Sequence, residues 1–383
     1  MYAKTPPMGW NSWNTFGPDL NEEIIRETAD AMVSQGYRDA GYQYIILDDG
    51  WMLPERDQDG LLVPDPEKFP GGMRALADYV HEKGMKLGIY SCAGTRTCGR
   101  FPGSFDHEFS DARQFAEWQV DYLKYDFCNF PKSADCRQRY LMMAMALRAS
   151  GRDIFFAACN WGLKSPEKWM RAIGANSFRS THDILDNFPS AARIALSQLE
   201  AFSASAAPCF NDMDMLTVGM FGKGHVGLED PNNQADTACT ETDYITQFAL
   251  WSSMGSALIL GADIRKMAPA MRSLVCNKAL IAINQDEECR APYVVYQEDD
   301  LRFSFIRHMS DNALVLAYFN LSDEAAEVDM IFADLGIPYP SGVDLRLSDI
   351  LLRREMGVFR DHCPLEIGAH GCRILKASFV KRG

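Results

Sequence analysis

The stretch VDYLKYDFCN, residues 120–129, begins like a buried strand and ends on charged side chains. Tyr122 and Leu123 are side chains that a protein core takes up readily. Lys124 and Asp126 lie two positions apart, so both would leave a strand on the same face. Ionised groups are costly to desolvate unless they are paired or used. The stretch therefore predicts a strand that carries a base and an acid into a site.

Seven other short segments have the length and the β-branched or aromatic content of a strand. They are residues 8–13, 42–47, 86–90, 153–159, 177–181, 207–210 and 256–261. Amphipathic stretches separate them. Asn21 can cap a helix that stops at Gly36, a second helix from Met73 closes on Gly84, and further helices fit 133–150, 165–174, 190–204, 237–254 and 267–284.

This alternation predicts an α/β fold in which residues 1–285 form a (β/α)8 TIM barrel. Repeated parallel strands need helical crossovers, and a closed barrel has no exposed edge. An open doubly wound sheet is the competing fold, but neither a GxGxxG nor a Walker sequence follows an early strand.

The pattern of predicted secondary structure changes after residue 285. Short strand-like segments follow one another there, separated by Asp, Asn, Ser, Gly and Pro, with no helical pattern of comparable strength between them. They are residues 291–297, 301–308, 313–319, 343–347 and 372–379. We expect residues 286–383 to form a smaller antiparallel β-sandwich domain.

Composition bounds the partners of the chain. The net charge of −14 and the lack of a Lys/Arg cluster argue against nucleic acid or an anionic membrane as partner. No signal-peptide pattern opens the sequence and no apolar run is long enough to cross a bilayer, so a cytoplasmic protein is expected, or a secreted one if Met1 is not the native start. The eleven cysteines show no CxxC spacing, and most are expected to be buried thiols. A homo-oligomer is left open.

In a (β/α)8 barrel the residues at the carboxyl ends of the strands converge on one face. The residues predicted there are Trp10, Asn11, Asp48, Asp49, Trp51, Tyr90, Lys124, Asp126, Asn160, Trp161, Arg179, Asp183, Asn211, Asp212, Asp214 and Asp263. Carboxylates and amides pair with vicinal hydroxyls, and Trp rings cover the apolar face of a pyranose. The mixture favours a neutral polyhydroxylated ligand, since a phosphorylated substrate would call for more donors and fewer acids.

Two of these carboxyl groups are predicted to be catalytic. Glycoside hydrolysis needs one ionised carboxylate to attack and one protonated carboxyl to assist the leaving group. We predict Asp126 as the nucleophile, because the charge of Lys124 would keep it ionised, and Asp183, in RSTHD, as the acid/base with Arg179 nearby. The plainer alternatives are a Lys-Asp ion pair for Asp126 and a helix cap for Asp183.

Other acids and aromatic residues keep alternatives open. Asp48 and Asp49 could instead hold a metal ion together with Asp212 and Asp214, although no His accompanies them at ligand spacing. Trp10, Trp13 and Trp51 could all be core residues, and for Trp13 the core is the preferred interpretation.

Eight motifs, in order, resemble glycoside hydrolase family 27, the α-galactosidase family. They are PPMGWNSWNTF (6–16), YIILDDGW (44–51), KLGIYSCAGTRTCGRFPGS (86–104), YLKYDFCN (122–129), CNWG (159–162), FRSTHDI (178–184), NDMDML (211–216) and INQD (283–286). The resemblance covers the whole barrel region, and the C-terminal segment is similar only in its strands and its ending. It implies a retaining (β/α)8 enzyme with a C-terminal β domain and no metal or organic cofactor.

The resemblance also implies roles for single residues. The nucleophile falls on Asp126 and the acid/base on Asp183. Asp48 and Asp49 would hold the 4- and 6-hydroxyls of galactose, Lys124 the 3- and 4-hydroxyls, and Arg179 and Asp214 the region of the 2-hydroxyl. Trp10 and Tyr90 would line the pocket, and Cys98 would pair with Cys128 beside the nucleophile, with Cys98 also at the substrate.

Two departures from the family bear on specificity. Asn160 stands where several relatives carry Glu, and Cys159 lacks the partner cysteine of some animal members, so it is expected to be free. Asn160, Trp161 and Leu163 look bulky in the loop that meets the 2-position, which favours a free 2-hydroxyl. The intact Asp48-Asp49 pair favours galactose over β-L-arabinopyranose.

The sequence therefore predicts a retaining exo-α-galactosidase that acts on small carbohydrates with terminal α-galactose. The alternatives within the family are an α-N-acetylgalactosaminidase and a β-L-arabinopyranosidase. An alternative from another class is a catalytically silent carbohydrate-binding barrel, and a metal-dependent barrel enzyme is a further one.

Overall fold

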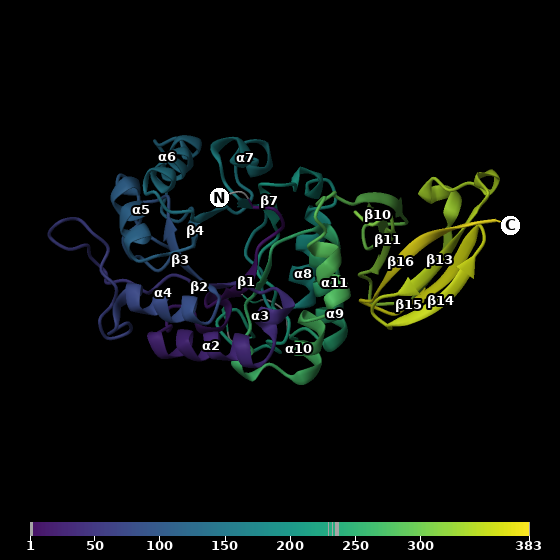
Figure 1. Ribbon diagram of the computed structural model, residues 1–383, viewed down its shortest axis with the longest axis horizontal. Coiled ribbons are helices and arrows are strands. Elements are labelled where there is room, and N and C mark those ends of the chain that lie inside the picture. Colours follow the sequence, from purple (N-terminus) through teal and green to yellow (C-terminus); the bar gives the residue numbers. More distant parts are fainter. Residues whose placement is uncertain (1–2, 229, 232, 234–236, 383) are drawn as a thin grey trace.

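The computed structural model describes residues 3–228, 230–231, 233 and 237–382. Its first part is a curled sheet of eight parallel strands in the order β7-β6-β5-β4-β3-β2-β1-β8 (Figure 1). The strands are β1 (Met8–Asn11), β2 (Tyr44–Leu47), β3 (Lys86–Cys92), β4 (Tyr122–Asp126), β5 (Phe155–Cys159), β6 (Ser177–Arg179), β7 (Phe210–Asp212) and β8 (Leu258–Leu260). All eight predicted strands are present, and the α/β barrel prediction is confirmed.

Backbone hydrogen bonds join the last two strands and close the sheet into a barrel. The Ala257 N–H donates to the Asn211 carbonyl at 3.3 Å, and the Leu216 N–H donates to the Ile259 carbonyl at 2.7 Å. The chain just after β7 thus continues along β8. Closure brings all the strand ends to one rim, which is where the site was predicted.

Strand β4 shows how the barrel positions charged groups. Leu123 and Tyr125 face outward into the core beneath the helices, whereas Tyr122 belongs to an apolar cluster inside the barrel. Side chains alternate along a strand, so Lys124 and Asp126 share the inward face with Tyr122. The apolar ring stack of Tyr122 on Phe155, with centroids 4.9 Å apart, fills the barrel below the charged groups.

Helices follow the strands and cover the outside of the barrel (Figure 1). The Asn21 side chain accepts a hydrogen bond from the Ile24 N–H at 2.9 Å, as predicted for a helix cap. The helices are α1 (Trp13–Phe16), α2 (Glu22–Ser34), α3 (Tyr37–Ala40), α4 (Gly72–Glu82), α5 (Glu108–Glu117), α6 (Cys136–Ala149), α7 (Met170–Ile173), α8 (Phe188–Ser197), α9 (Glu241–Met254), α10 (Pro269–Val275) and α11 (Lys278–Asn284). None of the described helices is long and apolar enough to span a bilayer.

The sequence analysis missed helix α5. Its buried face includes Glu108 and Asp111, which pair with Arg139 and Arg56 at 3.2 and 2.7 Å. A helix that buries paired charges lacks the apolar stripe on which a periodicity argument depends.

The C-terminal part is an antiparallel β-sandwich, as predicted. A six-stranded sheet in the order β14-β13-β16-β11-β10-β9 faces a two-stranded sheet of β12 and β15, with an apolar cluster between them. The strands are β9 (Tyr293–Gln297), β10 (Arg302–His308), β11 (Leu314–Asn320), β12 (Ala326–Ile331), β13 (Val343–Asp349), β14 (Arg354–Phe359), β15 (His362–Ile367) and β16 (Cys372–Lys381). The sequence analysis missed β12, β14 and β15, of which β14 is a largely exposed edge strand and β15 contains Pro364.

The other face of the six-stranded sheet packs on the barrel beside α8, α9 and α11 (Figure 1). Phe305 lies in one continuous core with Phe202 of the barrel, at a centroid distance of 6.2 Å. His370 stacks on Phe188 at 3.9 Å and contacts Asp243 of α9 at 2.8 Å. The boundary predicted at 285/286 falls between α11 and β9 and stays a prediction, since a shared core joins the two parts.

Candidate active site

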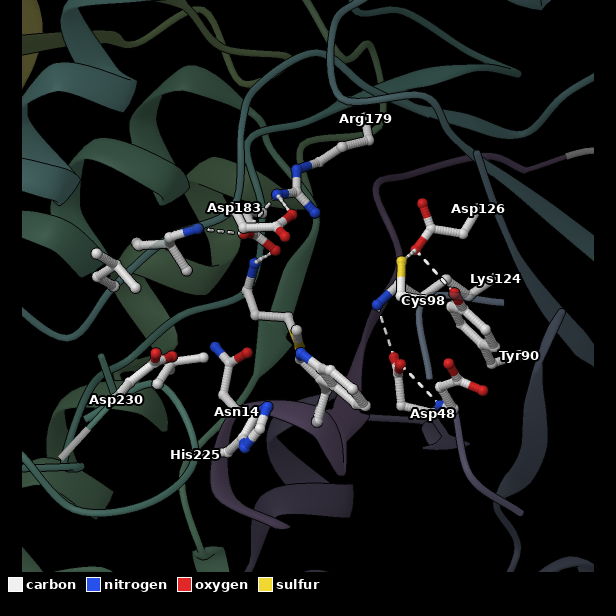
Figure 2. A pocket seen from close by; sticks show the side chains of 17 residues that line it. Asn14, Asp48, Tyr90, Cys98, Lys124, Asp126, Arg179, Asp183, His225 and Asp230 are labelled. Atoms are coloured by element: carbon white, nitrogen blue, oxygen red, sulfur yellow. Dashed lines mark hydrogen bonds and ion pairs between the residues drawn. The ribbon is translucent and has the colours of Figure 1, made fainter. Parts of the chain in front are cut away.

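One cavity opens at the rim where the barrel strands end (Figure 2). Its volume of about 320 Å³ suits a small ligand. Six carboxylates and two permanent cations are among the residues that line it. The lining residues are Trp13, Asn14, Asp48, Asp49, Tyr90, Cys98, Lys124, Asp126, Arg179, Asp183, Ile184, Leu185, Asp214, Met215, His225, Val226 and Asp230.

Asp126, the last residue of β4, is buried but reaches the cavity. Its Oδ1 accepts the Phe127 N–H at 2.8 Å, and its Oδ2 accepts the Tyr90 hydroxyl at 3.1 Å. Burial raises the pKa of Asp126 to about 6, although Lys124 acts in the opposite direction. The carboxylate is therefore held by two donors in one orientation and is ionised at neutral pH.

Lys124 forms its ion pair with a different acid from the one expected. Its Nζ lies 2.6 Å from Oδ2 of Asp48, and the same oxygen accepts the Asn11 amide at 2.7 Å. Burial alone would lower the pKa of Lys124, but Asp48 and other nearby acids raise it above the ordinary value. The prediction that Lys124 keeps Asp126 ionised is right in direction. It is incomplete, because burial outweighs that charge.

Asp49 is fixed by backbone donors at the same edge. Its carboxylate accepts the Gly50 N–H at 2.9 Å and the Gly99 N–H at 2.7 Å. Burial raises the pKa of Asp49 to about 6 despite these donors. Asp48 and Asp49 thus bind protein donors from β1, β4 and the loop after β3.

On the opposite wall one arginine holds two acids. Nη2 of Arg179 lies 2.8 Å from Asp183 and 2.6 Å from Asp214, whose Oδ2 also accepts the Ile184 N–H at 2.7 Å. Burial raises the pKa of Asp214, against the effect of Arg179. The Asp183 side chain is 73% exposed, whereas that of Asp214 is 4% exposed. Asp183 is therefore the acid of this pair that solvent and a ligand reach.

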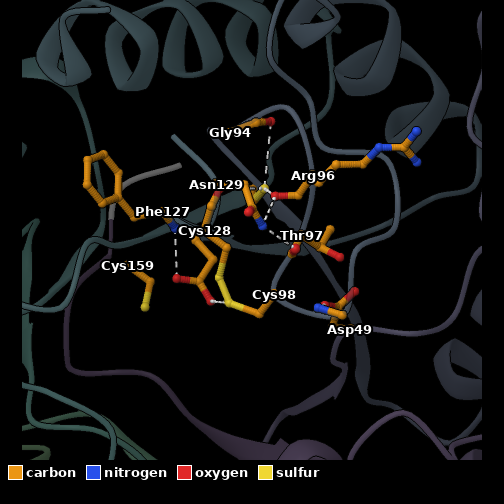
Figure 3. Close-up of a disulfide and its surroundings, with 12 residues drawn as sticks. Asp49, Gly94, Arg96, Thr97, Cys98, Phe127, Cys128, Asn129 and Cys159 are labelled. Carbon is orange, nitrogen blue, oxygen red and sulfur yellow. Dashed lines mark hydrogen bonds between the residues drawn. A yellow bond between two sulfur atoms is a disulfide. The ribbon is translucent and has the colours of Figure 1, made fainter. Parts of the chain in front are cut away.

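A disulfide joins Cys98 and Cys128 across the rim, as the resemblance implied (Figure 3). It links the loop after β3 to the segment that follows Asp126, with the two Cα atoms 5.1 Å apart. The Cys98 sulfur lies 4.0 Å from Oδ2 of Asp126. Cys159 is a free buried thiol, as expected.

Two of the residues predicted to bind the substrate, Trp10 and Asn160, do not line the cavity. Trp10 is completely buried and its indole N–H donates to the Ala262 carbonyl at 2.8 Å, so it is a core residue. Asn160 is also completely buried, and its amide donates to the Leu163 carbonyl. Trp13 lines the cavity instead, so the preference for a core Trp13 is wrong. The two Trp residues are three positions apart, and composition alone does not show which of them faces the cavity.

Asn160, Trp161 and Leu163 are all absent from the cavity lining, so the structure gives no support to the argument that they exclude a bulky 2-substituent. Other strand-end residues have structural partners. Trp51 donates to the Tyr90 carbonyl at 2.9 Å, and Asp263 caps a short helix and pairs with Arg265 at 2.8 Å.

The sequence analysis also missed a group of lining residues. Asn14 follows Trp13 directly, while His225 and Asp230 lie in the long segment between β7 and α9. The described residues of that segment form no strand or helix, so no period in the sequence indicates which side chains face the barrel. The only sequence signal for these lining residues is the motif NSWN, which contains Asn14, but Asn14 was not predicted as a site residue.

Comparison with known proteins gives a consistent result. Residues 5–286 match the family model described as "Alpha galactosidase A". The chain is 42% identical over 373 residues to an alpha-galactosidase of Cyamopsis tetragonoloba, covering 97% of this chain and 86% of the relative. The structure is similar to that of alpha-galactosidase I from Mortierella vinacea, with a TM-score of 0.87, 31% identity and 99% and 98% of the two chains covered. It is also similar to an α-galactosidase from Saccharomyces cerevisiae solved with raffinose, with a TM-score of 0.86, 25% identity and 98% of each chain covered.

Proposed function

This chain belongs to the α-galactosidase A family, glycoside hydrolase family 27, and we propose that it uses Asp126 and Asp183 as the two carboxyl groups of a retaining hydrolysis. The enzyme is a glycoside hydrolase that acts on α-galactosides. The site must explain which of its acids is the nucleophile and which is the acid/base.

The observation that carries the proposal is the meeting of these two acids in one cavity from two different strands. Asp126 ends β4 and Asp183 follows β6, and both line the same pocket. They are near enough that the charge of Asp183 helps to raise the pKa of Asp126. The two acids stand in different environments, since Asp126 is buried and oriented by the Phe127 N–H and the Tyr90 hydroxyl, whereas Asp183 is exposed to a ligand.

In the first step Asp126 attacks the anomeric carbon of a terminal α-galactosyl unit while Asp183 gives its proton to the glycosidic oxygen, and the leaving alcohol departs. A β-galactosyl-enzyme ester results. In the second step Asp183, now ionised, takes a proton from water as the water attacks the anomeric carbon. α-Galactose is released and Asp126 is free again.

The remaining acids and cations support recognition of the sugar. Asp48, Asp49 and Lys124 form one fixed group beside Tyr90, where ionised acceptors and a donor can pair with neighbouring hydroxyls. Arg179 and Asp214 form a second group across the cavity. These groups fit the 3-, 4- and 6-hydroxyls and the 2-hydroxyl of galactose respectively.

Azide rescue assigns the two roles separately. We expect Asp126→Gly with azide and nitrophenyl α-galactoside to yield β-galactosyl azide, because azide replaces the nucleophile in a single displacement. We expect Asp183→Gly with azide to yield α-galactosyl azide, because azide then attacks the β-galactosyl-enzyme. Either product in the opposite configuration, measured by NMR, would show that the two roles are wrongly assigned.

A further inference from the structure

The loop that carries Asp183 holds a second acid, Asp186, to which the proposed chemistry gives no role. Asp186 lies three positions after Asp183, between β6 and α8, and is completely buried. Burial raises its pKa to about 6, although its hydrogen-bond donors act in the opposite direction. Among the residues that the structure describes, no Lys, Arg or His forms an ion pair with it. A buried carboxylate without a counter-ion destabilises the fold, so an acid at this position calls for an explanation.

The carboxylate of Asp186 joins its own loop to two other parts of the barrel. Its Oδ1 accepts the hydroxyl of Tyr244 in α9 at 2.8 Å, and its Oδ2 accepts the Gly222 N–H at 2.7 Å. Its own N–H donates to the Val226 carbonyl at 3.1 Å, and Val226 lines the cavity. Hydrogen bonds to an ionised acceptor are stronger than those between neutral groups. The charge of Asp186 therefore holds the loop against α9 and against the segment between β7 and α9.

Asp183 depends on its backbone for its position. Its side chain is largely exposed, and its contact at 2.8 Å uses a nitrogen of Arg179 that also contacts Asp214. The N–H of Ile184, the next residue, donates to Asp214 at 2.7 Å. The backbone that carries Asp183 is thus held by Asp214 directly beside it and by Asp186 three positions later.

The position of this loop bears on proton transfer. Figure 2 shows Asp183 and Asp126 on opposite sides of the cavity, so a shift of the Asp183 loop would change the gap in which a galactosyl unit is held. A general acid must lie within hydrogen-bond reach of the atom that it protonates. A misplacement of about 1 Å can lower the rate by about 100-fold.

We propose that Asp186 is a positioning residue for the acid/base, whose carboxylate fixes the loop where Asp183 reaches the glycosidic oxygen. Asp186 does not line the cavity, so it acts through Asp183 and not on the substrate. The inference rests on the proposed function, since it requires Asp183 to be the proton donor.

The test uses two leaving groups that differ in their need for a proton. Methanol leaves only when it is protonated, whereas 2,4-dinitrophenolate leaves as a stable anion. We expect Asp186→Asn to lower kcat/KM for methyl α-galactoside by about 10- to 100-fold, because a misplaced acid donates its proton poorly. For 2,4-dinitrophenyl α-galactoside, kcat/KM should change less than about twofold, as should the inhibition constant of free galactose. Asp183→Gly should show the same difference between the two substrates, and a larger one.

Asp121→Asn is the matched control, because it removes another buried carboxylate that holds segments together. Asp121 directly precedes β4, at the end of the strand remote from the cavity, and contacts Arg152 at 2.5 Å and His81 at 2.7 Å. The substitution should lower the melting temperature and change kcat/KM for both substrates by less than about twofold.

Tyr244→Phe keeps the proposal testable if Asp186→Asn does not fold. It removes one donor to Asp186 and should lower kcat/KM for the methyl substrate by about three- to tenfold, with little effect on the dinitrophenyl substrate. Equal losses on both substrates, or no loss on either, would overturn the positioning role. If Asp183→Gly itself showed no difference between the two substrates, Asp183 would not be the acid/base and the proposed function would fail instead.

Discussion

At the scale of single residues, the buried carboxyl group of Asp126, which the reaction needs in its ionised form, lowers the stability of the fold. Burial raises the pKa of Asp126 to about 6, above the value of about 4 for an exposed Asp. At a pH between these two values, the folded protein therefore keeps a proton that the unfolded chain has already released. Ionisation of this buried carboxyl group therefore lowers the free energy of unfolding as pH rises from about 4 to about 6, and the decrease is complete above that range.

Asp126→Asn should consequently yield an inactive but more stable enzyme. Above pH 7 we expect a gain on the order of 2–3 kcal/mol in the free energy of unfolding, which disappears near pH 4. The Asn side chain can still accept the Phe127 N–H, so the local geometry is kept. Denaturant unfolding of both proteins at pH 7.5 and pH 4.5 measures the effect. A wild-type protein that is the more stable at pH 7.5 would contradict it.

The same carboxyl group should control the acidic limb of activity. Asp126 attacks only when ionised, so kcat/KM for nitrophenyl α-galactoside should fall as pH decreases, with its midpoint near pH 6. A midpoint below about pH 4, typical of an exposed carboxyl, would show that burial does not govern the nucleophile.

At the scale of elements, the disulfide is the link between the loop after β3 and the end of β4. Thirty residues separate Cys98 from Cys128, and closing a loop of that length should stabilise the fold by about 3–4 kcal/mol. The double variant Cys98→Ser, Cys128→Ser should lose about that much in urea unfolding. It should also bind galactose more weakly, because Gly99 of the same loop holds Asp49.

Cys276→Ser, at a partly buried free thiol, is the control and should change neither quantity. If dithiothreitol left both the unfolding midpoint and the galactose inhibition constant of the wild-type enzyme unchanged, the bridge would have no part in the site.

Strand β4 also shows what could be predicted from the sequence. Its two-residue period placed Lys124 and Asp126 on one face, and the barrel requires that face to point inward at the rim. Helix α5 gave no such signal, since it buries Glu108 and Asp111 with arginine partners from distant segments. Partners far apart in the sequence leave no local pattern.

The loops of the site were the hardest part to predict. Trp10 and Trp13 lie within one short motif, and only the packing of Trp10 beneath Ala262 shows which of them is core. His225 faces the cavity because Gly17 leaves room for its ring, a contact between segments more than 200 residues apart. Neither periodicity nor capping chemistry carries information about contacts of that kind.

At the scale of the whole molecule, the barrel and the β-sandwich share one core and should unfold together. Phe305 of β10 is completely buried against the barrel. Phe305→Ala should lower the free energy of unfolding by about 3–5 kcal/mol. The temperature at which activity is lost should then decrease by as much as the melting temperature of the sandwich. Tyr339→Ala, at a residue 64% exposed, should change neither. Two separate melting transitions would contradict a shared core.

The central claim is that Asp126 forms the bond to galactose, and the most direct measurement is to trap that bond. A fluorinated galactosyl fluoride that reacts quickly and hydrolyses slowly should leave one galactosyl group on the protein. Peptide mass spectrometry should then find it on Asp126, with no label in Asp126→Asn. Label on Asp183, or an unlabelled protein whose first released product is β-galactose, would contradict the mechanism.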